Sequence, residues 1–71
     1  MRYVVRIERG EGSWGAHVPD LPGRVAAAET REEVVELIRE AMEFHLEGLR
    51  EEGGIAPQPH SDFEFLEVNA A

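Results

Sequence analysis

Three histidines are the side chains of this sequence best suited to chemistry, and the first of them lies close to a serine and an aspartate. Ser13, His17 and Asp20 together supply the residue types of a nucleophilic triad. On an extended strand, however, Ser13 and His17 lie roughly 13 Å apart, because each residue advances about 3.3 Å. That separation is too long for the hydrogen bond that activates a serine, so we expect no triad.

His60 and Asp62 have residue types that bind divalent cations. A metal centre needs three or four converging ligands, and no further ligands follow at the usual spacing, although an oxygen-rich site stays open as an alternative. The chain has no cysteine, which excludes thiolate zinc sites, cysteine nucleophiles and disulfides. Neither a phosphate-binding glycine loop nor a convergent pair of carboxylates is recognisable. We therefore expect no catalysis, no metal and no cofactor.

His45 lies at the centre of the apolar face of a predicted helix. A buried neutral imidazole there needs a hydrogen-bond partner for each nitrogen. We expect a histidine satisfied in the core or in an interface. The alternative is an interface contact that responds to pH.

Acidic residues dominate the charge of the chain. Fifteen Asp and Glu stand against seven Lys and Arg, which gives a formal net charge of −8. Lysine is absent, so the clustered cations that phosphate contacts require are missing, and we expect no direct nucleic-acid binding. The excess of carboxylates suits a basic protein partner. The alternative is that these acids only confer solubility.

The length of 71 residues fits one domain spanning residues 1–71. A chain this short buries only about 60 % of its unfolded surface, and without disulfides it gains most by associating with itself. We expect a dimer or tetramer. No apolar run approaches the roughly 20 residues of a membrane span, and Arg2 and Arg6 interrupt the N-terminal apolar stretch too early for a signal peptide. We expect a cytoplasmic protein.

The elements that must carry these residues begin with alternating segments. Residues 2–8 and 13–18 alternate apolar and polar side chains, and the glycines between them predict a hairpin. The segment Pro19–Gly23 ends the second strand, because proline lacks the N–H of a ladder. Residues 24–28 are short and rich in alanine, which also suits a helix, but their place after Gly23 predicts a third strand.

A long helix is predicted over residues 31–52. Thr30 and Glu33 form a capping box, and Gly53 can take the left-handed C-terminal cap. The apolar sector spans about 200°, wider than one sheet face requires. Its flanks are therefore expected in a subunit interface, or alternatively half-exposed; they consist of Val35, Phe44 and Leu46. The opposite face carries the residues expected to bind a partner, which are Glu36, Glu40, Glu43 and Glu47.

A last strand is predicted over residues 62–68, and its alternation slips. Phe63 and Phe65 share one face, whereas Leu66 and Val68 share the other. Either a bulge lies near Phe65 or both faces are covered, and the second possibility adds Phe65, Leu66 and Val68 to the expected oligomer interface. The element order β-β-β-α-β predicts a two-layer α+β domain with an antiparallel sheet.

The order of motifs resembles that of the HicB-like antitoxin family over nearly the whole chain. The helix also contains Glu43-Phe44-His45-Leu46-Glu47, and Pro57-Gln58-Pro59 follows it. The residues that carry the most specific part of the resemblance are Trp14, Pro19, Asp20, Leu21, Pro22 and Gly23, followed by Thr30 and Glu33.

The resemblance implies a partial ribonuclease-H-like fold without catalytic carboxylates, and association into dimers or tetramers. It further implies neutralisation of a small basic HicA-type toxin, an mRNA-cleaving ribonuclease whose catalytic histidine and RNA surface become covered. Arg24 stands where the family often has Cys, and Ala28 where Gly is frequent. Many members carry a further C-terminal DNA-binding segment; the chain ends at Ala71, so we expect it to act without one. An orphan structural or regulatory oligomer that binds another protein is the alternative.

Overall fold

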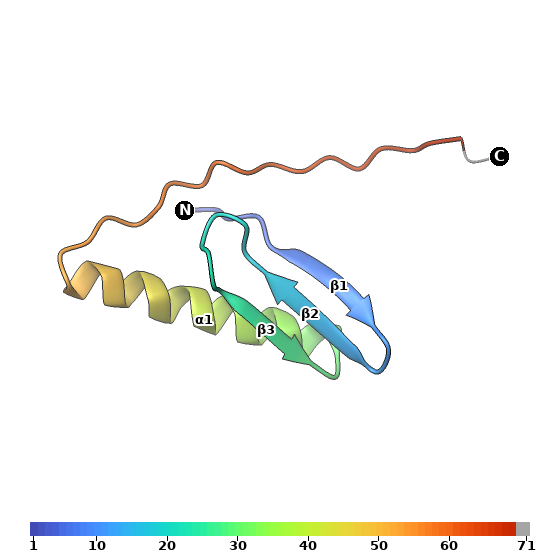
Figure 1. The fold of residues 1–71 in the computed structure, drawn as a ribbon, viewed down its shortest axis with the longest axis horizontal. Coiled ribbons are helices and arrows are strands. Elements are labelled where there is room, and N and C mark those ends of the chain that lie inside the picture. The colour runs from blue at the N-terminus through green and yellow to red at the C-terminus, as the bar shows by residue number, and fades with distance from the viewer. Residues whose placement is uncertain (70–71) are drawn as a thin grey trace.

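The fold consists of one antiparallel sheet with a single helix on one face. A computed structural model describes residues 1–69. The elements are β1 (Arg6–Gly10), β2 (Ser13–His17), β3 (Val25–Ala28) and α1 (Arg31–Glu51), and the sheet order is β1-β2-β3 (Figure 1). This arrangement confirms the predicted α+β class with three antiparallel strands followed by a long helix.

The hairpin forms where the sequence predicts it. Gly10 pairs with Ser13 across a two-residue turn, and Gly12 takes a φ of 67° that favours glycine. β1 begins at Arg6 rather than at residue 2. The residues after His17, which would lie opposite residues 2–5, do not continue the hydrogen-bonded ladder between β2 and β1. The N–H of Val18 points toward the β3 side, where it donates to the Arg24 carbonyl, and Pro19, the next residue that would donate to β1, has no N–H.

The loop between β2 and β3 is part of the core. Leu21 is fully buried and Asp20 and Val18 are buried beside it. Backbone hydrogen bonds within residues 18–24 close the loop, and Gly23 takes a φ of 82°. The predicted stop after β2 is therefore confirmed, and this loop also supplies side chains that fill the space under the helix.

Both predicted helix caps are confirmed. The Thr30 hydroxyl accepts a hydrogen bond from the Glu33 N–H at 3.1 Å and itself donates to the Glu33 carboxylate at 3.2 Å. At the other end, Gly53 has a φ of 75°, Gly53 N–H bonds to the Arg50 carbonyl, and Gly54 N–H bonds to the Leu49 carbonyl. This is the Schellman pattern, which satisfies the last free carbonyls.

The helix covers only part of the sheet. α1 packs on β3 and β2, where the small side chains of Ala26 and Ala28 allow a close approach, and its length of about 31 Å exceeds the roughly 17 Å of a five-residue strand. Figure 1 shows its C-terminal half extending past the sheet. The buried apolar core is correspondingly small and consists of Ala16, Val18, Leu21, Val34 and Ile38.

The predicted last strand is wrong for this single chain. Residues 55–69, which we call the C-terminal arm, run extended from the end of α1 past the N-terminus without joining the sheet (Figure 1). Phe63, Phe65, Leu66 and Val68 are all exposed. An extended segment becomes a strand only when a second backbone pairs with it, and within residues 1–69 no ladder partner reaches the arm. The ribonuclease-H-like detail stays a prediction.

No helix within residues 1–69 is long and apolar enough to cross a membrane.

Candidate protein-binding site

An acidic ridge runs along the solvent side of α1. Its residues are exposed, as the sequence predicts, because the helix turns its buried residues Val34 and Ile38 toward the sheet. We use the name acidic ridge for Glu36, Glu40, Glu43 and Glu47.

The acidic ridge has little internal compensation. Glu36 and Glu40 lie four residues apart, as do Glu43 and Glu47, and such like-charged pairs repel. Among the described residues the ridge has one ion pair, in which Arg39 approaches Glu36 at 4.0 Å, and both side chains are well exposed. A solvated pair of this kind neutralises little charge. The ridge therefore presents a negative surface to any partner.

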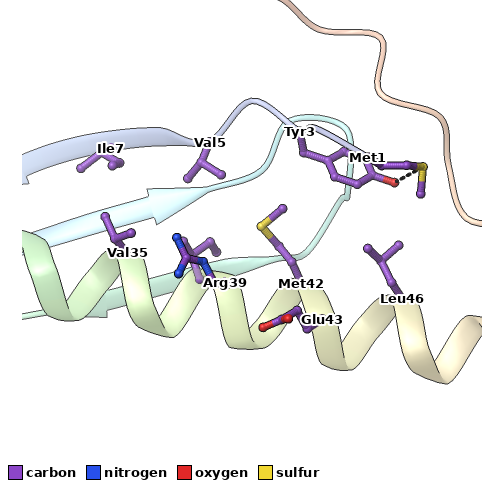
Figure 2. Close-up of a pocket in the computed structure, with 10 residues that line it drawn as sticks. Met1, Tyr3, Val5, Ile7, Val35, Arg39, Met42, Glu43 and Leu46 are labelled. Atoms are coloured by element: carbon purple, nitrogen blue, oxygen red, sulfur yellow. Dashed lines mark hydrogen bonds between the residues drawn. The ribbon is translucent and has the colours of Figure 1, made fainter.

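An apolar groove lies beside the ridge, between α1 and the N-terminal segment. Its volume is about 390 Å³. Val5 and Ile7 face it from the sheet side and Met42 lies across from them (Figure 2). The remaining lining residues are Met1, Tyr3, Val35, Ile38, Arg39, Glu43 and Leu46. The groove exists because α1 packs over β3 and β2 and leaves the β1 side of the inner face open.

The three helix-flank residues predicted for an interface do not share one surface. Val35 and Leu46 are half-buried and line the groove. Phe44 is 79 % exposed and lies with Arg24 and His45 at a different hollow. The residues of the expected interface therefore lie on two separate surfaces: Val35 and Leu46 in the groove, and Phe44 outside it.

Asp20 is the most connected polar residue of the structure. Its side chain is buried, and Oδ2 accepts hydrogen bonds from the backbone N–H groups of His60 at 2.8 Å and Ser61 at 2.9 Å. Oδ1 accepts from the Ser61 hydroxyl at 2.6 Å and lies 3.1 Å from His60 Nε2. We call this set of contacts the Asp20 clamp. It fixes the base of the C-terminal arm to the loop between β2 and β3.

The Asp20 clamp contains the three residue types of a catalytic triad but not its geometry. In a triad the histidine lies between the carboxylate and the serine, so that the imidazole can take the hydroxyl proton. Here the Ser61 hydroxyl and the His60 imidazole both approach the same oxygen of Asp20. The arrangement holds the chain together and does not activate Ser61.

The clamp also changes the acidity of Asp20. The hydrogen bond from the Ser61 hydroxyl lowers the pKa of Asp20 below its ordinary value of 3.8; burial opposes this, and the backbone N–H groups of Ser61 and His60 and the His60 imidazole add to it. The carboxylate is therefore ionised at neutral pH.

The other candidate residues are not brought together. Ser13 and His17 occupy opposite ends of β2, and Asp20 is engaged with His60 and Ser61 instead. Asp62 caps the N–H of its neighbour Phe63. Within the part of the chain that the structure describes, no group of three or more His, Asp or Glu side chains could hold a metal ion.

His45 differs from the expectation of a core histidine. It is half-buried and lines a small hollow with Arg24, Phe44 and Leu49. The helical periodicity places His45 on the apolar side of α1, but the side chain is only half-buried there.

Comparison with known proteins decides the family. The sequence profile described as "HicB_like antitoxin of bacterial toxin-antitoxin system" matches residues 3–69. The chain belongs to the HicB-like antitoxin family. The resemblance found in the Pro19–Gly23 loop and the helix is thereby confirmed.

Two relatives of the HicB-like domain show the same extent of similarity. The chain is 34 % identical over 76 residues to "Antitoxin HicB 2" of Photorhabdus laumondii, covering all of this chain and 52 % of that protein. It is also 34 % identical over 66 residues to an uncharacterized 14.9 kDa protein of Haemophilus phage HP1, covering 93 % of this chain and 50 % of that protein. The HicB-like domain thus spans about half the length of these relatives. No solved structure gives a significant match.

Sequence reasoning missed the Asp20 clamp because its partners are 40 and 41 residues away. The sequence indicated Asp20 as part of the family motif and His60 as a candidate metal ligand, but no local sequence pattern links the two residues. The conspicuous Pro57 and Pro59 were the nearest available signal, since they stiffen the segment that brings His60 to the loop.

Proposed function

We propose that this HicB-like domain is a non-catalytic, cytoplasmic antitoxin module that neutralises a HicA-type mRNA-cleaving toxin. Its acidic ridge covers the basic RNA-binding and catalytic surface of that toxin, and self-association presents more than one ridge to the partner. Membership of the antitoxin family supports the role. The exposed and poorly compensated ridge supports the mode of binding.

The physical basis of the proposal is electrostatic complementarity. A ribonuclease that binds RNA must carry clustered cations, and a run of carboxylates on a rigid helix can occupy the same cations. Such charge pairs raise the association rate and weaken as salt is added. The groove and the arm are not required for this contact, because the acidic ridge faces solvent on α1.

A cleavage assay tests the proposal. A HicA-type ribonuclease is mixed with the purified chain in stoichiometric excess, and cleavage of a labelled RNA is followed. We expect the wild type to abolish cleavage and the double substitution Glu40→Gln with Glu47→Gln to weaken inhibition about tenfold or more, which corresponds to about 1.4 kcal/mol of binding free energy.

A matched control separates the position of the charges from their number. Glu11 lies in the hairpin turn and Glu29 precedes the helix, and both are exposed. Replacing both with Gln removes the same net charge away from the acidic ridge and is expected to leave inhibition unchanged. Undiminished cleavage with the wild-type chain would refute the antitoxin role and leave an orphan oligomeric module as the better description.

A further inference from the structure

A small hollow outside the groove brings an unpaired cation, an acid and an exposed aromatic together. It has a volume of about 170 Å³ and lies between the loop that precedes β3 and the last turns of α1. We call it the Arg24 hollow; its lining residues are Arg24, Phe44, His45, Gly48, Leu49 and Glu52. No glutamate of the acidic ridge is among them. We propose that the Arg24 hollow binds a free α-amino acid with an apolar side chain.

The charge of Arg24 has no counter-charge in the structure. The backbone of Arg24 is fixed on both sides, because its N–H donates to the Leu21 carbonyl and its carbonyl accepts from the Val18 N–H. The side chain is half-buried, and its buried Nε has no hydrogen-bond partner. No ion pair within residues 1–69 involves it. A guanidinium held partly out of water without a partner favours an anion, and its planar set of N–H groups matches a carboxylate.

Glu52 lines the same hollow without pairing with Arg24. The two charges are opposite, yet no ion pair joins them in the described part of the chain. A zwitterion satisfies both, with its carboxylate at Arg24 and its ammonium group at Glu52. The negative end of the α1 dipole lies at this end of the helix and also favours an ammonium group. A ligand with a carboxylate alone would leave that carboxylate facing the charge of Glu52.

The rest of the wall suits a hydrocarbon side chain. Phe44 is 79 % exposed and Leu49 is half-buried, so a ligand that covers them removes apolar surface from water on both sides of the contact. His45 adds a ring nitrogen that can donate or accept a hydrogen bond. The volume of about 170 Å³ equals that of about six water molecules at roughly 30 Å³ each. That is the size of one amino acid and too small for a folded partner segment.

Gly48 keeps the hollow open at a position where glycine has no internal use. It lies inside α1, where glycine is less favourable than alanine. A Cβ added at Gly48 would meet no atom within 4 Å besides the backbone of its own helix, so no packing contact requires glycine there. Because Gly48 lines the hollow, a methyl group at this position would narrow it. A ligand in the hollow gives the missing side chain a role.

Titration with L-leucine tests the proposal. The isotope-labelled full chain is titrated and its amide NMR signals are followed. We expect saturable shifts at Arg24 and within residues 44–52, and none at Glu11 in the hairpin turn. Leucinamide lacks the carboxylate and isocaproate lacks the ammonium group, and each should bind about tenfold more weakly than L-leucine. Isocaproate binding as tightly as L-leucine, or wild-type shifts that do not saturate, would overturn the proposal.

Two variants and a control separate binding from folding. Arg24→Gln removes the cation and should weaken L-leucine binding about tenfold. Gly48→Ala should weaken it to a similar extent while raising the midpoint of thermal unfolding, because alanine favours the helix. A weaker site in a more stable chain does not come from misfolding.

Arg50→Gln is the matched control, because it removes the same charge from the same end of α1 outside the hollow. It should bind L-leucine as the wild type does. Wild-type affinity in Arg24→Gln or in Gly48→Ala would contradict the assigned site. None of these measurements involves a toxin or the acidic ridge, so failure here leaves the proposed function standing.

Discussion

At the scale of single residues, the most consequential side chain is a buried carboxylate in a loop. Asp20 accepts hydrogen bonds from two backbone N–H groups and one hydroxyl of a segment some 40 residues further along. Each of these donors would otherwise need water, and an ionised acceptor makes each hydrogen bond stronger than a neutral one would. Asp20 therefore positions the arm, and the ridge on α1 does not depend on it.

Replacing Asp20 with Asn should release the base of the arm. An amide has one acceptor oxygen where the carboxylate has two. Its NH₂ group would face donors that now bond to Oδ1 or Oδ2 of Asp20, so at least one donor loses its acceptor. Hydrogen exchange at the His60 and Ser61 amides should accelerate in the variant while α1 keeps its protection. Asp62→Asn is the control, because Asp62 bonds only to its neighbour Phe63 among the described residues.

Acid should have the same effect on the wild-type clamp. The pKa of Asp20 is lowered in the folded chain, so its contribution to stability is fully present above the ordinary value of 3.8 and is lost as the pH falls through the lower folded value. The two amides should lose protection below about pH 4 in the wild type. An arm whose amides are equally protected in the wild type and in Asp20→Asn at neutral pH would contradict the clamp.

At the scale of elements, local sequence information was sufficient wherever the structure is local. The hairpin, the third strand and both helix caps follow from glycines, alternation and the pair Thr30 and Glu33, all of which act within a few residues. The acidic ridge was equally predictable, because helical periodicity alone decides which face its glutamates occupy.

The parts that could not be predicted depend on distant partners. β1 starts late because Pro19, the next residue after β2 that would donate to it, has no N–H. The arm is no strand because nothing within residues 1–69 pairs with it. The groove arises from the position of α1 over β3 and β2, which no short pattern encodes. The apolar residues of the segment 62–68 predicted that it packs against another surface, but they could not identify that surface.

The N-terminal cap of α1 allows a quantitative prediction at this scale. Thr30→Ala removes the acceptor for the Glu33 N–H and should lower the free energy of unfolding by about 1 kcal/mol. Urea denaturation followed by circular dichroism measures the change. Thr30→Ser keeps the hydroxyl and should retain most of the stability; an equal loss in both variants would show that the methyl group, rather than the cap, carries the effect.

At the scale of the whole molecule, the chain buries too little for its length. Five apolar side chains form the buried core, whereas the exposed large hydrophobic residues among residues 1–69 include Val25, Phe44 and five residues of the arm. A single copy of this size gains only a few kcal/mol from such a core. Self-association, as proposed, would add stability by covering part of this exposed apolar surface.

Thermal stability should therefore depend on protein concentration. If folding and dimerisation are coupled, mass action raises Tm by roughly 3 to 5 °C for each tenfold increase in concentration. Differential scanning calorimetry between 10 µM and 1 mM would measure this slope. Phe65→Ser should reduce the slope, because it removes an exposed aromatic side chain of the arm that the sequence predicts in the oligomer interface. A Tm that is independent of concentration in the wild type would mean that the small core suffices alone.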